Sequence, residues 1–327
     1  MRKKNILLVN DTSLICHHGC TLLMNLMCEL FIKNNFLIKD RIFYEENYLS
    51  FNKNLNNYDL IIINGEGTIH GKKNSDSNKV YEIFEFIKSV KSKYDIPIVV
   101  INSTIASLQK YQLSILRLVD KIYVREEFSY NYLKKNKIQS KILPDLLSIL
   151  TLKGETKSEK TIVNDSSIKK TTMLLINYAK SMNYEYVPIL YNNYLRFFRF
   201  IIFKFCLKIK AYFLVNFYLY LKKLYLLDFI KNTKKANFII TGRFHSIFVC
   251  LALMKPFYTF ESDTYKIRGL IRMIGINSRI IGTDNLKKIK INKFSKLEIS
   301  KINQFKKNSK KKVKKFIKEI KELAHND

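Results

Sequence analysis

The sequence has no tryptophan, only 4 prolines and 9 glycines in 327 residues, and 27 acidic residues against 58 lysines and arginines. The shortage of acidic residues leaves a formal charge of +31, which favours anionic partners such as phosphorylated substrates, anionic lipid or nucleic acid. Much of the excess is lysine beside abundant asparagine and isoleucine, as expected of a low-GC coding sequence, so charge alone does not choose among these partners. The basic residues are dispersed and no recognised nucleic-acid motif is present, which argues against a nucleic-acid partner.

Cysteine is also scarce, and its spacing excludes two classes of site. The five cysteines are odd in number and form no CxxC pair, so we expect a reducing, cytoplasmic environment instead of a disulfide framework. Cys16, His17, His18 and Cys20 are neighbours, but their spacing matches no zinc signature, and no metal is predicted. The apolar run Asn5–Val9 is too brief for a signal peptide, so export is not expected.

Long apolar runs are absent as well. The most apolar region, Tyr191–Leu227, has Ala211–Leu221 as its longest uncharged run, well short of the roughly 20 residues that span a bilayer. Lysine and arginine recur there among aromatic residues, a composition typical of helices that lie in the headgroup plane. The sequence therefore predicts peripheral attachment to the inner face of the cytoplasmic membrane, with a helical hairpin packed on the domain core as the alternative.

What the sequence does contain is a repeated alternation of strands and helices. Such alternation predicts an α/β protein with two Rossmann-like, doubly wound parallel sheets. We expect strands at Lys4–Asn10, Ile42–Tyr44, Tyr58–Ile63, Ile96–Ile101, Lys121–Val124, Thr161–Val163, Tyr184–Leu190 and Asn237–Thr241. The predicted parts are an N-terminal domain 1–152, a linker 153–160, a C-terminal domain 161–284 with a helical insertion 191–232, and a Lys-rich C-terminal helix 285–327.

The second half repeats the beginning of the first. Asn10-Asp11-Thr12 and Asn164-Asp165-Ser166 both stand where a first strand passes into a helix, as cap-like sequences. This repetition suggests two similar domains that face one cleft. Since ligands of open parallel sheets bind beyond the carboxyl ends of the strands, residues that follow predicted strands are the candidates for function.

Four of the five histidines follow predicted strands. His17 and His18 come after the first strand, His70 follows the turn Gly65-Glu66-Gly67, and His245 follows the strand that ends at Thr241. A single histidine is more often a hydrogen-bonded structural residue than a catalyst, but this clustering favours function.

Two loops carry the most specific chemistry. In Asn64–Gly71 the glycines allow the backbone to approach a ligand and Glu66 supplies a carboxylate, but the loop lacks both the GxGxxG spacing of a dinucleotide site and a P-loop lysine. Thr241–Ser246 joins Arg243, a cation that can grip phosphate or carboxylate, to His245 at the expected start of a helix. Arg125 is a second candidate cation, or else a surface arginine that pairs with Glu126 or Glu127.

The order of these motifs resembles the polysaccharide pyruvyl transferase family over about residues 5–280. The resemblance rests on Tyr58–Thr68, Val124-Arg125-Glu126-Glu127-Phe128-Ser129, Pro144-Asp145, Ile240-Thr241-Gly242-Arg243-Phe244-His245-Ser246, Lys255-Pro256 and Tyr265-Lys266-Ile267-Arg268-Gly269-Leu270.

The resemblance implies a GT-B-like fold and a transferase of bacterial surface-polysaccharide biosynthesis, such as that of capsule or lipopolysaccharide. Phosphoenolpyruvate would be the donor, a glycan or lipid-linked glycan the acceptor, a pyruvate ketal the product, and no further cofactor would be needed. The donor side would use Arg243, Arg125, Ser246, Asp165 and Ser166. The acceptor side would use Asp11, Thr12, His17, His18, Gly65, Gly67, Thr68 and His70.

Proton transfer would fall to His245 and Glu66, because ketal formation requires protonation of the donor methylene and deprotonation of a sugar hydroxyl. Two alternatives stay open. A glycosyltransferase that uses a nucleotide sugar would bind its diphosphate through the same Arg243 and helix terminus, and a noncatalytic scaffold at the membrane surface would need neither residue.

Overall fold

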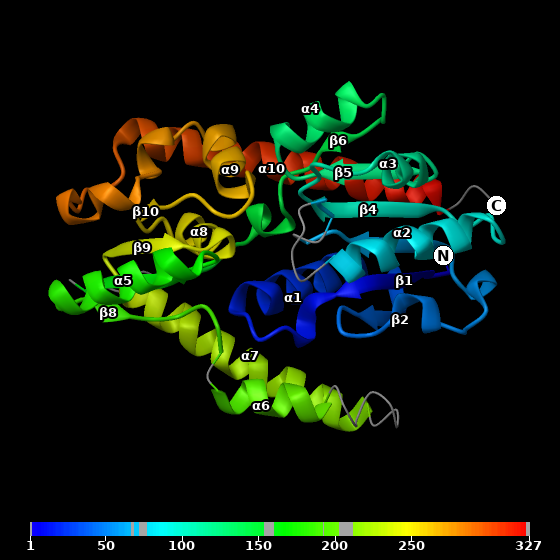
Figure 1. Ribbon diagram of the computed structural model, residues 1–327, viewed down its shortest axis with the longest axis horizontal. Coiled ribbons are helices and arrows are strands. Elements are labelled where there is room, and N and C mark those ends of the chain that lie inside the picture. Colours follow the sequence, from blue (N-terminus) through cyan, green and yellow to red (C-terminus); the bar gives the residue numbers. More distant parts are fainter. Residues whose placement is uncertain are drawn as a thin grey trace. The chain divides into compact units, whose positions relative to one another are not determined.

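The computed structural model describes residues 2–66, 69–71, 77–153, 160–191, 193–202 and 212–324 (Figure 1). Two compact units divide the chain, and each is described by itself. Unit 1 comprises Met1–Leu14, Met24–Leu146 and Ser309–Asp327, and unit 2 comprises Ile15–Leu23 and Leu147–Asn308. Most of the predicted linker 153–160 lies outside the described residues, and the predicted domain boundaries stay a prediction.

Unit 1 is built on a six-stranded, fully parallel sheet in the order β2-β1-β3-β4-β5-β6. Its central strands are continuous apolar runs because both faces of a parallel sheet are covered by helices. The strands are β1 (Lys4–Asp11), β2 (Phe36–Phe43), β3 (Leu60–Asn64), β4 (Ile98–Ser103), β5 (Lys121–Val124) and β6 (Lys141–Ile142). The helices are α2 (Ser77–Lys91), α3 (Lys110–Leu116), α4 (Glu127–Lys135) and most of α1 (His18–Lys33).

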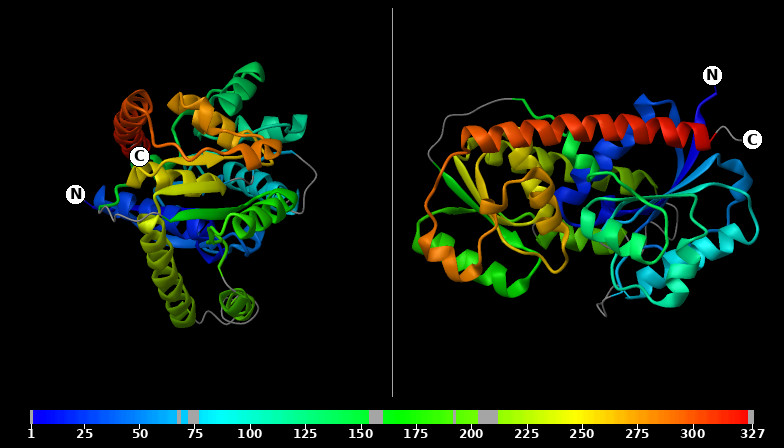
Figure 2. Two further views of the ribbon diagram at one scale, coloured as in Figure 1. Left: turned by 90° about the vertical axis from the view of Figure 1, so that its left-hand side faces the viewer. Right: turned by 90° about the horizontal axis from the view of Figure 1, so that it is seen from above.

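Unit 2 has a four-stranded parallel sheet in the order β10-β9-β7-β8. Its strands are β7 (Thr161–Ser166), β8 (Glu185–Tyr186), β9 (Phe238–Gly242) and β10 (Phe257–Thr259). The helices are α5 (Lys169–Ser181), α6 (Asn193–Ile201), α7 (Tyr212–Lys235), α8 (Phe244–Leu253) and α9 (Lys266–Ile274). The long helix α10 (Lys296–Leu323), orange to red in Figure 2, begins in unit 2 and ends in unit 1.

The two sheets share one strand order, since β8-β7-β9-β10 repeats β2-β1-β3-β4. In each sheet the second strand along the chain pairs with the first strand on one side, and the third strand then pairs with the first strand on its other side. The order therefore reverses between β1 and β3 in unit 1, and between β7 and β9 in unit 2. Crossover connections leave a crevice at such a reversal, which is where open α/β sheets bind ligands. The predicted α/β class with two parallel sheets is confirmed.

Three elements differ from the expectation for physical reasons. Strand β8 is far shorter than Tyr184–Leu190, because Pro188 has no N–H to donate and the Ile189 amide donates to the Asp165 carboxylate at 2.8 Å instead. Strand β2 begins at Phe36 and not at the expected Ile42, because the charged residues Asp40 and Arg41 also pair with β1. The C-terminal helix begins only at Lys296, because Ser295 and Glu298 form a reciprocal capping box at its start and Arg279 binds the carbonyls of Asn292 and Lys293 before it.

The helix caps also differ. Asp11 accepts a hydrogen bond from the Ser13 amide at 2.7 Å and so closes a short turn, whereas α1 begins only at His18. Similarly, α5 has Ile168 as its N-cap residue, and Asn164-Asp165-Ser166 lies within strand β7.

Among the described residues, no helix combines the length and the apolarity that crossing a bilayer requires.

The close approach of β7 and β9 makes a direct prediction about Gly242. A Cβ at this position would lie 2.4 Å from the Cβ of Ser166, so Gly242→Ala should lower the free energy of unfolding by about 1–3 kcal/mol. Urea denaturation checks this, with Gly282→Ala as the matched control, because a Cβ there would have its nearest neighbour at 3.9 Å. Ser166→Gly should restore part of the loss; equal stability of both alanine variants would contradict the packing argument.

Candidate functional site

An ion pair joins the carboxyl ends of the two central strands of unit 2. Asp165, near the end of β7, accepts hydrogen bonds from Nε of Arg243 at 2.9 Å and from its Nη2. The arginine follows β9 directly and is the N-cap residue of α8. Both side chains are largely buried, with 15% of the arginine and 3% of the aspartate exposed. The guanidinium is therefore fixed at the strand-order reversal.

Two further contacts hold the start of α8 at the same place. The hydroxyl of Ser246 donates to Oδ1 of Asn164 at 2.6 Å, which ties the first turn of α8 to β7. Gly242 lets β9 approach Ser166 more closely than any side chain would allow. Because the first amides of a helix point along its axis with no partner in the helix, this arrangement combines amide donors with a fixed cation. Helix termini of this kind can bind phosphate or carboxylate.

A cavity of about 480 Å³ opens beside this pair. Arg243, Asp165 and Lys169 contribute its charged lining, and Tyr186 adds a phenol. Burial raises the pKa of Tyr186 to about 12, with the Asp165 carboxylate adding to the shift and Arg243 opposing it, so the phenol keeps its proton at neutral pH and can donate a hydrogen bond. The cavity is large enough for a small anionic substrate.

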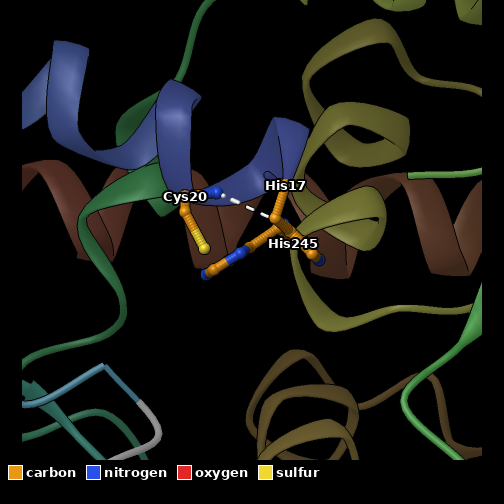
Figure 3. A group of neighbouring side chains, drawn as sticks. All are labelled: His17, Cys20 and His245. Atoms are coloured by element: carbon orange, nitrogen blue, oxygen red, sulfur yellow. Dashed lines mark hydrogen bonds between the residues drawn. The ribbon is translucent and has the colours of Figure 1, made fainter. Parts of the chain in front are cut away.

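The start of α1 also belongs to unit 2, and it brings His17 to His245. The two rings meet edge to face, with centroids 5.8 Å apart. A Cβ on Gly19 would lie 2.4 Å from Cβ of His245, so only glycine allows this approach. Figure 3 shows His17, Cys20 and His245 converging on one small volume.

His17 serves as the cap of α1. Its Nδ1 accepts hydrogen bonds from the amides of Gly19 at 3.0 Å and Cys20 at 3.3 Å. Burial, then the charge of Arg243 and of neighbouring groups that include Lys266, holds the pKa of His17 well below its ordinary value. The ring is therefore neutral, and because Nδ1 accepts, its proton is on Nε2. His17 can donate one hydrogen bond but cannot supply a positive charge.

His17, Cys20 and His245 also form a group that could hold a metal ion, with one ligand atom of each within 4.8 Å of the others. A cysteine and two histidines are suitable zinc ligands. Two features of the group oppose a cation. Nδ1 of His17 already accepts two helix amides, and Arg243 and Lys266 are near enough to lower the pKa of that ring. The first feature occupies a potential ligand atom, and the second favours an anion over a cation.

His18 has a different environment from its neighbour. Its ring stacks on Phe229 at 4.7 Å and contacts Tyr191 at 4.2 Å. Burial, with a smaller contribution from Lys222, lowers the pKa of His18 to about 3. The side chain thus packs as a neutral aromatic ring in unit 2. This packing favours a structural role for His18 over contact with a ligand.

In unit 1 the strand-order reversal is lined by amides. Asn10 donates through Nδ2 to the carbonyl of Asn64, and the Asn64 amide returns a bond to the Asn10 carbonyl at 3.3 Å. Asn102, near the end of β4, donates to the Asn64 side chain at 3.3 Å. The Tyr48 hydroxyl completes the group by donating to Asn10 at 2.7 Å. Three neighbouring strand ends are thereby linked through neutral polar groups.

The predicted acceptor residues of unit 1 lie at this edge. Asp11 ends β1 and pairs with Arg41 at 3.3 Å, and the Thr12 hydroxyl donates to the Glu66 carboxylate. Gly65 follows β3, and a Cβ there would lie 2.5 Å from Ser103, so the β3 loop packs tightly on β4. Gly67 and Thr68 lie outside the described residues.

The two remaining predicted residues of unit 1 are buried. Arg125 is 2% exposed, donates through Nε to Thr104 at 2.7 Å and pairs with Asp145 at 3.6 Å. Its acidic neighbour Glu126 instead caps α4 through the amides of the first turn. His70 is also buried, and its backbone pairs with that of Ala106.

Comparison with known proteins now adds to this geometry. The family model for polysaccharide pyruvyl transferase matches residues 17–264, which include both strand-end motifs of unit 2. The chain belongs to the polysaccharide pyruvyl transferase family. A transferase is what the family name implies, and the resemblance seen in the motifs is confirmed. No curated protein matches the chain.

Solved structures with a similar fold include an uncharacterised protein from Klebsiella pneumoniae, which is 13% identical, with 85% of this chain and 93% of that chain covered and a TM-score of 0.50. A UDP-GlcNAc 2-epimerase from Neisseria meningitidis, bound to UDP-GlcNAc, is 12% identical, with 95% and 100% covered and a TM-score of 0.45. The corresponding enzyme from Methanocaldococcus jannaschii, in complex with UDP-GlcNAc and UDP, is 11% identical, with 92% of both chains covered and a TM-score of 0.45.

Sequence reasoning missed several residues of these edges. Tyr186 and Lys169 line the cavity of unit 2, yet neither stands in a motif. The asparagines Asn64 and Asn102 did follow predicted strands, and that position was the signal by which they could have been proposed. The position of Cys20 beside His245 could not be inferred from the sequence, because the two residues are far apart along the chain.

Neutral burial of His18 makes stability depend on pH. The pKa of His18 is about 3 in the folded state and near 6.5 unfolded, so the unfolded chain binds the extra proton as the pH falls below 6.5. This contribution is complete above that pH and is lost on acidification. Between pH 7 and pH 5, His18→Phe should remove roughly 2 kcal/mol of the pH-dependent loss, as measured by urea denaturation at both values. Unchanged pH dependence in the variant would exclude a neutral, buried His18.

Proposed function

We propose that the protein transfers a pyruvyl group from phosphoenolpyruvate to two hydroxyls of a surface glycan. In this reaction two carbon–oxygen bonds form at C2 of the donor and its bond to the phosphate oxygen breaks. One hydroxyl proton ends on the methylene, which becomes a methyl group, and the other leaves with the phosphate. The products are a pyruvate ketal and inorganic phosphate.

The observation that carries the proposal is the position of Arg243. In a pyruvyl transferase family member, a guanidinium held by Asp165 at the N-terminus of α8, beside a cavity of about 480 Å³, suits a small donor with both phosphate and carboxylate groups. Ser166 lies at the same edge of unit 2 and would add a hydroxyl donor, whereas the Ser246 hydroxyl already donates to Asn164 and would hold the first turn of α8 in place. Neutral His17 would add its Nε2 proton. The donor contact that we predict for Arg125 rests on the family resemblance alone.

Proton transfer is the second requirement of the reaction. We assign it to His245 and Glu66, one at each strand-order reversal. His245 lies in the first turn of α8, next to the proposed donor, where an imidazole could protonate the methylene. Glu66 accepts a hydrogen bond from Thr12 at the edge proposed for the acceptor, where a carboxylate could take a hydroxyl proton.

The acceptor part of the proposal follows from the family name and from the amide and hydroxyl groups that line the strand-order reversal of unit 1. Amides and hydroxyls at the ends of β1, β3 and β4 are the groups that bind sugar hydroxyls. The donor is a metabolite of the cytosol, so we assign the reaction to the cytoplasm. Polysaccharide of the capsule or lipopolysaccharide type is the proposed destination.

Ligand-induced thermal stabilisation tests the donor. Millimolar phosphoenolpyruvate should raise the melting temperature of the purified protein by mass action, and Arg243→Ala should abolish the shift. Arg117→Ala is the matched control, because Arg117 is an exposed arginine of unit 1. Inorganic phosphate and pyruvate, tested separately, report which end of the donor the site prefers.

The same titration separates the alternatives. A shift with nucleotide sugars in place of phosphoenolpyruvate would reject pyruvyl transfer in favour of glycosyl transfer through the same helix terminus. No shift with either class of donor would reject both. Full biological function of a variant that lacks both Arg243 and His245 would leave the site without a catalytic role and favour the noncatalytic scaffold.

Kinetics test the two proton-transfer residues. His245→Gln and Glu66→Gln should each lower kcat for phosphate release from phosphoenolpyruvate and acceptor by about 100-fold or more, while donor-induced stabilisation persists. Glu29→Gln serves as the control, since Glu29 is an exposed carboxylate on α1. Full activity of either variant would remove that residue from the mechanism.

A further inference from the structure

Helix α7 has two apolar faces. On one face Val215, Tyr218, Leu226 and Phe229 are buried within unit 2, and the same face holds the buried Lys222, whose ammonium donates to the Ile15 carbonyl. The second face carries large apolar side chains at positions spaced by four, three, four and three residues. At 100° per residue this spacing forms a stripe opposite the buried face. The stripe consists of Phe213, Phe217, Tyr220, Leu224 and Leu227.

Every residue of this stripe is exposed. The exposed fractions are 79% for Phe213, 50% for Phe217, 57% for Tyr220, 44% for Leu224 and 53% for Leu227. Single exposed apolar residues are ordinary, but a contiguous stripe of this length marks a surface that binds something. Packing within unit 2 does not require these residue types, since the opposite face already provides the contact.

The neighbouring helix α6 also carries exposed aromatic residues. It runs beside α7 (Figure 1), and the Tyr218 hydroxyl donates to the Leu195 carbonyl at 3.2 Å, which fixes one helix to the other. Leu195 is buried in this contact, whereas Tyr194, Phe197 and Phe198 are exposed. The stripe of α7 is called the aromatic face below.

Charge on the same side of α7 indicates what covers this face. One turn beyond Leu227 the stripe continues into Lys231, Lys234 and Lys235, and Asp228 is the single acidic residue of the helix. Aromatic and aliphatic side chains followed by lysines match a lipid interface, where rings enter the acyl boundary and ammonium groups meet anionic headgroups. We infer that the aromatic face docks unit 2 on an anionic bilayer surface, without spanning it. This inference does not depend on the donor or on the proposed reaction.

The absence of tryptophan from the sequence provides a clean reporter. Phe217→Trp places a single indole in the aromatic face, and Tyr81→Trp places one at an exposed position of α2 in unit 1 as the matched control. Vesicles of phosphatidylcholine with phosphatidylglycerol should shift the Phe217→Trp emission to the blue, and brominated lipid should quench it. The control should show neither change.

Flotation with the same vesicles measures the contributions of rings and charges. Replacing Phe213, Phe217 and Tyr220 together by serine should weaken binding at least about 100-fold, because three large apolar side chains no longer leave water. Replacing Lys231, Lys234 and Lys235 by glutamine should cost roughly fivefold for each lysine on anionic vesicles, with little change on pure phosphatidylcholine. Serine at Leu118, Met173 and Leu297, which are exposed apolar residues elsewhere, should leave binding unchanged.

Two outcomes would overturn the inference. Equal binding to neutral and anionic vesicles, or none to either, would exclude an anionic bilayer as the partner. A blue shift that follows protein concentration without lipid would identify the aromatic face as a contact between copies of the chain. Donor-induced stabilisation should persist in the serine variant of the aromatic face, so failure of the docking inference and failure of the proposed reaction are distinguishable.

Discussion

The ion pair between Arg243 and Asp165 is the interaction on which the candidate site depends. It joins the ends of β7 and β9 in a largely buried position. Removing one partner there leaves an uncompensated charge and lowers the free energy of unfolding by about 3–5 kcal/mol. Because Arg243 is also the N-cap residue of α8, the pair fixes where that helix begins. The direction of the helix amides and the position of His245 follow from it.

The two sheets solve one structural problem with different chemistry. Each has the strand order that leaves a crevice beside its first strand, and each carries polar residues at that point. In unit 2 these residues are a fixed cation, its carboxylate and a helix terminus. In unit 1 they are the linked amide side chains of Asn10, Asn64 and Asn102, beside the ion pair of Asp11 and Arg41 and the Glu66 carboxylate. An edge with a fixed guanidinium and an edge rich in amides and carboxylates suit the proposed pairing of an anionic donor with a hydroxyl acceptor.

Much of the fold could be predicted from local patterns. Strands such as Lys121–Val124 are continuous apolar runs between polar loops, and their boundaries agree with the structure. Where long-range contacts decide, the prediction was wrong. Strand β8 shortens because the Asp165 side chain takes the Ile189 amide, and α10 starts late because Arg279 binds the carbonyls before it. Neither long-range contact is visible in the sequence, although Pro188 and the capping box of Ser295 and Glu298 are local signals of the same two boundaries.

The sequence by itself determined the family, the α/β class, the repetition of a first strand in each half, and Arg243 with His245 as the residues to inspect. These features depend on hydrophobic periodicity and on motifs of a few residues, and both are set by neighbours along the chain. Only the tertiary structure decided that Asp165 holds Arg243, that His17 caps α1 beside His245 while His18 packs as a neutral ring, and that α7 exposes a second apolar face. Those outcomes depend on which distant residues share a desolvated space, because burial sets charge state, pairing and exposure.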